Sequence, residues 1–408
     1  MVVAEGKKTG LRGDAVIVGS AQLPPVRHFS GVPRFAIEQW CDLAARALAD
    51  AGIPSREVNG LACGGDILEA NFFTPATLAE YCGWSVSFAE RLDLGGASGL
   101  GMVWRAAAAI ELGICDVVVV ASVSGPRPEP PEAESPNPRA LWGASSNAWG
   151  SPQAEFDIPF GNLGQNCGYA MYAHRYHELY GWNERARAKI AADQRASAAA
   201  NPQAVFFGRP VTVEEVLASR MIADPLRLLE VVMPCAGGAA LVLTHRDRSA
   251  RLAHRGAAVT GFGEHLTHKT PTYAPDMDHT PVGPASQAAF AMAGIRPTEV
   301  DMVELYDCYT ITALLTLEDS GFCGKGEGMA FVEDHDLSYR GDFPCNTHGG
   351  QLGFGQAGQA GGMSQIVEAV AQIQGRAGDR QLRNHDLAYV SGTGGVMSEQ
   401  AALILAGL

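Results

Sequence analysis

The sequence has little charge and no basic segment. Its 408 residues include 18% Asp, Glu, Lys and Arg together, and the formal net charge is −14. Binding to nucleic-acid phosphates depends on clusters of Lys and Arg. An acidic chain without such a cluster is therefore not expected to bind nucleic acid, and its composition is typical of a soluble enzyme.

Long apolar segments are missing as well. The longest strongly apolar run, at about residues 117–123, is far shorter than the roughly 20 residues that cross a bilayer. Residues 1–14 contain three basic side chains but no apolar stretch behind them, so no targeting signal is predicted. We expect a cytoplasmic protein that does not associate with membranes.

Cysteine pairs with metal-binding or redox spacing are absent. The nine Cys are scattered and none forms a CxxC motif, which is typical of reduced, mostly buried thiols. His174 and His177 lie three residues apart, as do His265 and His268, but no third ligand accompanies either pair. The sequence therefore predicts no metal site.

Glycine is abundant and is concentrated in residues 344–362, where seven of nineteen residues are Gly. Glycine costs backbone entropy, so this density indicates tight turns or a close approach to a ligand or helix. Apolar residues with helical spacing follow at 363–373. The segment predicts a Gly-rich turn that leads into a buried helix, with Asn346 and His348 at its start.

Residues 353–358 also match the pattern G-x-G-x-x-G. A dinucleotide site would require a strand before this pattern and an acidic residue about 20 positions after it. Neither is present, so the pattern does not predict a nucleotide site.

Buried strands alternate with amphipathic helices along most of the chain, which is typical of α/β layers with a covered sheet. The pattern Ala-Gly-Ile-x-x-x-Glu-Val occurs at 51–58 and again at 293–300. A Gly turn followed by a helix at 95–112 is likewise matched at 349–375. These correspondences predict an internal duplication, and hence two similar core domains.

The predicted domains are an N-terminal core of residues 13–124 plus 235–247, an insertion of residues 125–234, and a C-terminal core of residues 256–408. The insertion is rich in large side chains, and these either line an apolar substrate pocket or form a core of their own: Trp142, Trp149, Phe156, Phe160, Tyr169, Met171, Tyr172 and Tyr176.

The duplicated halves, the insertion and the run Asn346-Thr347-His348-Gly349-Gly350 together resemble the thiolase superfamily, particularly its sterol-carrier-protein-type branch. Residues 304–309 and 391–395 match further motifs of that family, so the likeness extends from about residue 13 to the end. It implies an α/β thiolase fold, with two βαβαβαββ core domains in α-β-α-β-α layers and a large loop insertion. It also implies a homodimer formed through the core domains.

The chain departs from the thiolases at the reacting group. The turn that carries their nucleophilic Cys reads Gly96-Ala97-Ser98-Gly99 here, and their His-Pro is replaced by Gln356-Ala357. Ser391 stands at the place of the second Cys, and Tyr306 at that of an oxyanion-binding Asn. Claisen exchange proceeds through an acylated thiolate, and Gly96 cannot be acylated.

These departures are similar to those of thiolase-fold aldolases that shorten steroid side chains, where the Cys is absent and a Tyr stands in a motif like Tyr306-Asp307. The likeness implies retro-aldol cleavage of a 3-hydroxyacyl-CoA with a bulky, steroid-like side chain. The products are a ketone or aldehyde and a short acyl-CoA, and no cofactor takes part. A partner with an OB-fold and a zinc ribbon, of the DUF35 type, is also implied. One difference is that the second Tyr of those aldolases is replaced here by Gln359-Ala360.

The resemblance implies two catalytic residues. Tyr306 would act as acid and base, and His348 would hold the thioester oxygen together with backbone amides, facing Tyr306. A second group would form the oxyanion and substrate-positioning site, namely Asn346, Gly96, Ser391 and Gly392. Further candidates are Asp307, Gln356 and Cys345.

Two other functions stay open at this point. The chain could be an acyltransferase that uses a relocated nucleophile, for which Cys345 and Cys308 are the candidates. A stable thioester adduct on either Cys would support this function. The chain could instead be a non-catalytic subunit that binds acyl-CoA or scaffolds a partner, in which case CoA esters would bind without turnover.

Overall fold

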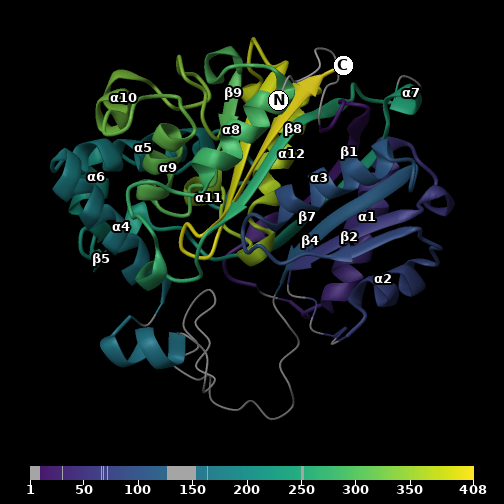
Figure 1. The fold of residues 1–408 in the computed structure, drawn as a ribbon, viewed down its shortest axis with the longest axis horizontal. Coiled ribbons are helices and arrows are strands. Elements are labelled where there is room, and N and C mark those ends of the chain that lie inside the picture. Colours follow the sequence, from purple (N-terminus) through teal and green to yellow (C-terminus); the bar gives the residue numbers. More distant parts are fainter. Residues whose placement is uncertain are drawn as a thin grey trace, which may run out of the picture.

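The computed structural model describes residues 10–29, 31–65, 67, 69–70, 72–125, 153–162, 164–249 and 252–408. Within these residues, nine strands form one sheet in the order β3-β2-β4-β7-β1-β8-β11-β10-β9, with helices on both sides (Figure 1). The N-terminal half of the chain supplies the first five strands of this order and the C-terminal half supplies the other four.

The N-terminal half has the element order βαβαβαββ. Its elements are β1 (Ala15–Val26), α1 (Ala36–Ala51), β2 (Gly60–Gly65), α2 (Thr74–Cys82), β3 (Phe88–Arg91), α3 (Ser98–Glu111), β4 (Val117–Ser124) and β7 (Ala236–His245). β2 pairs in parallel with β3 and β4, whereas β7 is antiparallel to β4 and β1. Residues 117–123 of β4 are buried, as expected for a strand that is apolar on both faces.

The C-terminal half repeats this order, except that its counterpart of β3 is shorter than a strand. Its elements are β8 (Ala257–Leu266), α8 (Val282–Ala293), β9 (Met302–Glu304), α9 (Thr310–Asp319), α10 (Gly328–Asp334), α11 (Gly350–Gly353), α12 (Met363–Ile373), β10 (Leu387–Gly394) and β11 (Glu399–Gly407). The counterpart of β3 is a single parallel bridge between Val303 and Cys345. The predicted duplication is thus present in the structure.

The repeated Ala-Gly-Ile pattern encodes the same helix ending in each half. α1 ends at Gly52, with φ 68°, and α8 ends at Gly294, with φ 74°. Glycine is favoured at such left-handed C-terminal positions because it has no Cβ. The buried Ile53 then follows Gly52, so the pattern fixes where the chain turns back toward the sheet.

Three large hydrophobic cores hold five layers together, and the middle core extends over both sides of its helix layer. The middle core holds the apolar faces of α3 and α12 together with strand residues from both halves, such as Val120 and Leu403. α1 and α2 cover the outer face of the N-terminal strands, and α8 and α9 cover that of the C-terminal strands. This arrangement confirms the predicted α-β-α-β-α order.

The insertion adds α4 (Gln165–Tyr180), α5 (Glu184–Ala199), α6 (Val213–Ala218) and a two-stranded ribbon of β5 (Met221–Ala223) and β6 (Leu226–Arg227). α5 packs against α9, α10 and α11 of the C-terminal half (Figure 1). No helix among the described residues is long and apolar enough to span a bilayer.

The aromatic side chains of the insertion separate into two groups. Tyr169, Tyr172 and Tyr176 of α4 are buried in the core of the C-terminal half, whereas Phe156 and Phe160 are exposed. Trp142 and Trp149 lie outside the described residues. The three tyrosines therefore belong to a core that the insertion shares with the C-terminal half and that also contains Tyr306.

Candidate active site

The N-terminal ends of α3 and α12 meet in the middle layer. A Cβ atom at Gly362, directly before α12, would lie 2.0 Å from the backbone oxygen of Gly96. The absence of a side chain at Gly362 therefore permits the close approach of the two turns. The first amides of a helix have no partner within the helix, and the helix dipole is positive at this end. The junction is thus suited to hold developing negative charge.

The end of β10 forms a third side of this junction. A Cβ at Gly392 would lie 2.9 Å from the Cα atom of Ala97, which shows how closely the strand approaches the turn before α3. Ser391 is buried, and its Oγ has no well-aligned hydrogen-bond partner. The structure therefore brings Gly392 to the turn that contains Gly96, whereas the Ser391 side chain lies beside Tyr389.

Tyr306 follows β9 and lies against Gly96. Its side chain is 2% exposed. A Cβ at Gly96 would lie 2.5 Å from Cζ of Tyr306 and 2.6 Å from its Oη. The phenol and the backbone oxygen of Thr393, which lies 2.4 Å from that Cβ, together occupy the space into which a side chain at position 96 would project. The two departures noted in the sequence, Gly at 96 and Tyr at 306, are parts of one structural change.

Gln356 is the hydrogen-bond partner of Tyr306. Its Nε2 donates to the phenol oxygen at 2.6 Å. The backbone of Gln356 is held by the end of the insertion, because its N donates to Met233 O at 3.0 Å and its O accepts from Cys235 N at 2.7 Å. These contacts fix the position of the amide beside the phenol.

Burial raises the pKa of Tyr306 well above its usual value, and the hydrogen bond from Gln356 only partly opposes this shift. The phenol therefore keeps its proton at neutral pH. Because the oxygen accepts from Gln356, the O–H group can donate to a bound substrate. Tyr306 is thus arranged as a proton donor.

Asp307 connects the Tyr306 segment to the Gly-rich turn. Its Oδ1 accepts from the backbone N of Gln351 at 2.6 Å, and a Cβ at Gly350 would lie 2.1 Å from its Oδ2. Burial raises the pKa of Asp307 to about 7. The carboxyl group anchors the turn, and no hydrogen bond joins it to Tyr306.

His348 belongs to a different set of contacts. Its Nδ1 lies 3.2 Å from Glu304 Oε2, an ion-pair distance without hydrogen-bond alignment. Its Nε2 lies 3.3 Å from Ser364 Oγ, and its ring packs against Phe354. The structure does not bring His348 into contact with Tyr306. The hydrogen bond of the phenol is made by Gln356 instead, and the role expected for His348 stays a prediction.

His348 and Ser364 border a cavity of about 520 Å³ beside α12, which Arg46, Arg376 and Arg380 also line. Arg376 is paired with Asp50 and Arg380 with Glu368, a lining residue as well. The basic groups of this cavity are thus largely neutralised within the protein.

Asn346 lies at the start of the Gly-rich turn in a left-handed conformation, with φ 52°. Its side chain is fully buried, and neither Oδ1 nor Nδ2 has a hydrogen-bond partner. An unpaired buried amide is costly, which marks Asn346 as a group that a bound substrate could satisfy.

The two candidate relocated nucleophiles are both buried. Cys345 is 1% exposed and lies in the bridge to Val303, and Cys308 is 3% exposed. Burial raises the pKa of Cys308 to about 12 and that of Cys345 well above its usual value. Both sulfurs therefore remain thiols, whereas a nucleophilic cysteine requires a thiolate.

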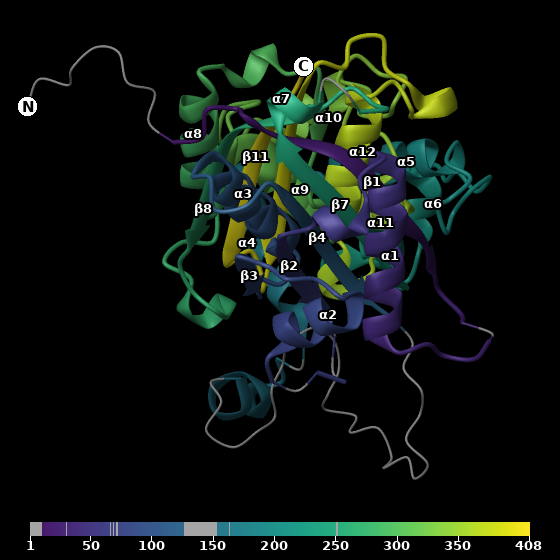
Figure 2. The ribbon, with the colours of Figure 1, turned by 90° about the vertical axis from the view of Figure 1, so that its right-hand side faces the viewer.

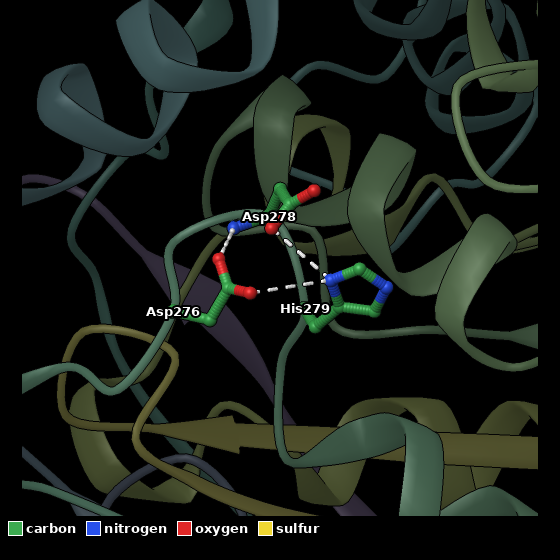
Figure 3. Close-up of side chains that lie close together, drawn as sticks. All are labelled: Asp276, Asp278 and His279. Carbon is green, nitrogen blue, oxygen red and sulfur yellow. Dashed lines mark hydrogen bonds and ion pairs between the residues drawn. The ribbon is translucent and has the colours of Figure 1, made fainter. Parts of the chain in front are cut away.

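The described residues contain one cluster with metal-ligand chemistry, formed by Asp276, Asp278 and His279 (Figure 3). Asp276 Oδ1 accepts from the backbone N of Asp278 at 3.1 Å, and His279 Nδ1 lies 3.1 Å from Asp278 Oδ1. Tyr180 donates to the second oxygen of Asp278. These groups are paired within the protein, and the cluster lies apart from the contacts of Tyr306.

Comparisons with known proteins relate the chain to enzymes of one family. Residues 263–407 match the family described as thiolase C-terminal domain-like. The chain is 32% identical over 370 residues to a steroid side-chain-cleaving aldolase of Thermomonospora curvata, covering 88% of this chain and 91% of the relative. It is 32% identical over 390 residues to the 17-hydroxy-3-oxo-4-pregnene-20-carboxyl-CoA lyase of Mycobacterium tuberculosis, covering 94% and 97%.

A solved structure, the Ltp2-ChsH2(DUF35) aldolase, matches with a TM-score of 0.83 and 30% identity over 97% of this chain and 98% of its own. The fold expected from the sequence is thereby confirmed.

Proposed function

Because the chain belongs to the thiolase superfamily, as do the aldolase and the lyase similar to it, we propose that it is a retro-aldolase acting on a 3-hydroxyacyl-CoA. The observation that carries this proposal is the Tyr306 phenol in the space that Gly96 leaves open. Acyl exchange needs a nucleophile at that point. Aldol cleavage needs a group that moves protons.

The reaction transfers one proton from the substrate and one proton to it. The β-hydroxyl group loses its proton, the Cα–Cβ bond breaks, and the β-carbon leaves as a ketone or aldehyde. The electron pair of the broken bond forms an acyl-CoA enolate, which is then protonated at Cα. A water molecule accepts the β-hydroxyl proton, because the protonated phenol cannot. Tyr306 then gives its proton to Cα, and the water returns a proton to the phenolate, so the enzyme is restored after each turnover. Gln356 stabilises the transient phenolate through its amide N–H.

The enolate oxygen carries the charge that develops in this reaction. The converging starts of α3 and α12 supply backbone N–H groups and the positive ends of two helix dipoles. We assign Gly96, Ser391 and Gly392 to this region, and Asn346 to substrate positioning through its unpaired amide. His348 supports the Gly-rich turn through Glu304 and Ser364.

The proposed substrate carries a steroid on its β-carbon, in keeping with the names of the two relatives. The rings of Tyr169 and Tyr309 stack with centroids 4.0 Å apart and lie close to Tyr306. They provide a rigid aromatic wall beside the reacting group. No cofactor is required, because the CoA thioester itself stabilises the enolate.

A second copy of the chain is the proposed partner at β3. This strand lies at the end of the sheet order, and the exposed Phe72, Phe73 and Tyr81 lie in and just before α2, which contacts β3. An open strand edge and an exposed apolar surface both favour association. We further propose a complex with an OB-fold protein of the DUF35 type, a kind named in the similar aldolase structure.

The direct test is to incubate the purified protein, alone and with a DUF35-type partner, with a steroid 3-hydroxyacyl-CoA that has a tertiary β-hydroxyl group. Mass spectrometry should detect the steroid ketone and the shortened acyl-CoA in equal amounts. Tight binding of the CoA ester without these products, even with the partner present, would instead identify a non-catalytic subunit.

A further inference from the structure

Two free cysteines meet on the outer surface of the N-terminal half. Cys41 lies in α1 and Cys82 is the last residue of α2, and these helices are side by side (Figure 2). Their Sγ atoms are 3.0 Å apart. The neighbouring Trp40 and Trp84 rings pack edge to face, with centroids 6.1 Å apart. This aromatic contact holds the two helices in a register that keeps the sulfurs together.

The pair combines proximity with access to solvent. Cys41 and Cys82 are both partly exposed, in contrast to the buried Cys63 and Cys115 nearby in the same half. The hydrogen bond between the two sulfurs lowers the pKa of Cys82 and raises that of Cys41. Cys82 therefore carries more of the thiolate, which is the form that reacts with oxidants.

We propose that Cys41 and Cys82 form a modification site at which hydrogen peroxide converts the two thiols into an intramolecular disulfide. The Cys82 thiolate attacks one peroxide oxygen, the O–O bond breaks, and the departing hydroxide takes up a proton to become water. The resulting Cys82 sulfenic acid is attacked by the Cys41 sulfur, so that the S–S bond forms and a second water leaves. The two sulfurs are oxidised by two electrons, and the peroxide is reduced to two waters.

The cross-link would join two helices that are otherwise held by side-chain packing. It would close a loop of the chain from residue 41 to residue 82, which contains β2 and α2. Closing a loop restricts the unfolded chain and also restrains the local opening of α2. Amide hydrogens of α2 are therefore expected to exchange more slowly in the oxidised protein.

The test uses the full chain, prepared reduced and then freed of reductant. The protein is treated with increasing hydrogen peroxide, its remaining thiols are alkylated, and its peptides are analysed by mass spectrometry without reduction. The expected result is a cross-linked pair of peptides that contain Cys41 and Cys82, lighter by two hydrogen atoms than the separate peptides. It should form at lower peroxide than any oxidation of Cys235 or Cys323, which are also partly exposed but have no sulfur partner among their contacts.

Cys41→Ser provides the matched variant. Without the resolving thiol, Cys82 should accumulate as a sulfenic acid that dimedone traps. A Cys82 that stays alkylatable in the folded wild-type protein, or that reaches sulfinic acid without the cross-link, would overturn the proposal. A cross-link found only between two copies of the chain would overturn it too. The readout is independent of aldolase activity, so its failure leaves the proposed function untouched.

Discussion

A side chain at position 96 and the phenol of Tyr306 cannot occupy the site together, since a Cβ at Gly96 would lie 2.5 Å from Cζ of Tyr306. The nucleophile of a thiolase and the tyrosine of this chain therefore compete for one volume. Gly96 leaves room that the phenol fills, and a phenol is suited to proton transfer instead of nucleophilic attack.

Replacing Gly96 should disable the enzyme without adding any charge or polar group. Gly96→Ala is expected to lower kcat by about 10²-fold, because displacing a reacting group by about 1 Å can cost that much. Gly283→Ala is the matched control. It makes the same chemical change in α8, where the nearest atom to a new Cβ is 3.5 Å away, and its kcat should be unchanged. Full activity in Gly96→Ala would mean that the phenol position does not matter.

Tyr306→Phe removes the hydroxyl group alone. If Tyr306 transfers a proton to the substrate, kcat should fall by roughly 10²–10⁴, and the lost hydrogen bond from Gln356 should cost about 0.5–1.5 kcal/mol of stability. Tyr309→Phe is the control, because Tyr309 OH donates to Asn166 at 2.6 Å instead. That change should cost about 0.5–1.5 kcal/mol of stability and leave kcat within a few-fold. A Tyr306→Phe enzyme as active as this control would refute the assigned role.

Gln356→Leu tests the hydrogen bond to the phenol. Losing one stabilising donor of about 1 kcal/mol or slightly more should lower kcat about 10-fold while KM changes little. Gln374→Leu is a suitable comparison, since its amide donates to Arg255 O at 3.0 Å instead of to Tyr306. An equal effect of the two substitutions on kcat would show that Gln356 acts only through folding.

Asp307 predicts a specific pH dependence of stability. Burial raises its pKa from 3.8 to about 7, so the folded protein holds this proton at pH values where the unfolded chain has released it. The raised pKa makes the folded state lose stability as the pH rises from about 4 to 7, with no further change above that. Asp307→Asn cannot ionise and escapes this loss.

The unfolding free energy of Asp307→Asn, relative to wild type, should therefore increase between pH 5 and pH 8. The expected gain is about 2–3 kcal/mol, from 1.36 kcal/mol per pKa unit. Denaturant titrations at the two pH values measure it. If the unfolding free energies of the two proteins change equally between the two pH values, Asp307 does not have the raised pKa.

Cys345→Ala separates the aldolase from an acyltransferase with a relocated nucleophile. We expect turnover within a few-fold of wild type and a loss of thermal stability, because Cys345 is buried in the strand bridge to Val303. Intact-protein mass spectrometry after incubation with acyl-CoA should show no adduct. An acyl thioester on Cys345 would restore the acyltransferase hypothesis.

The fold was largely predictable because its signals are local and occur twice. The two Ala-Gly-Ile patterns correspond to two left-handed helix ends at Gly52 and Gly294. The continuous apolar run of β4 predicts a strand that is covered on both faces. The reduced strand at Cys345 could not be foreseen. Its extent depends on hydrogen bonds to Val303 and Leu337, which leave no pattern in the segment itself.

The site was only partly predictable, for a related reason. Motif positions predicted Tyr306, Asp307 and the glycines at 96 and 392 as site residues, and the structure brings Tyr306 against Gly96. Gln356 was a candidate, but its pairing with Tyr306 is set by the end of the insertion, at Met233 and Cys235. This contact joins three separate parts of the chain, so sequence spacing could not distinguish it from a pairing of Tyr306 with His348.

The antiparallel pairing of β1 with β8, through Val16–Ala258 and Ile17–Ala257, has a mechanical consequence. It makes the two halves one continuous sheet, and α3 and α12 lock both into the same core. The halves therefore cannot swing apart like the lobes of a hinged enzyme. Entry of a substrate to Tyr306 therefore cannot depend on a hinge opening between the two halves.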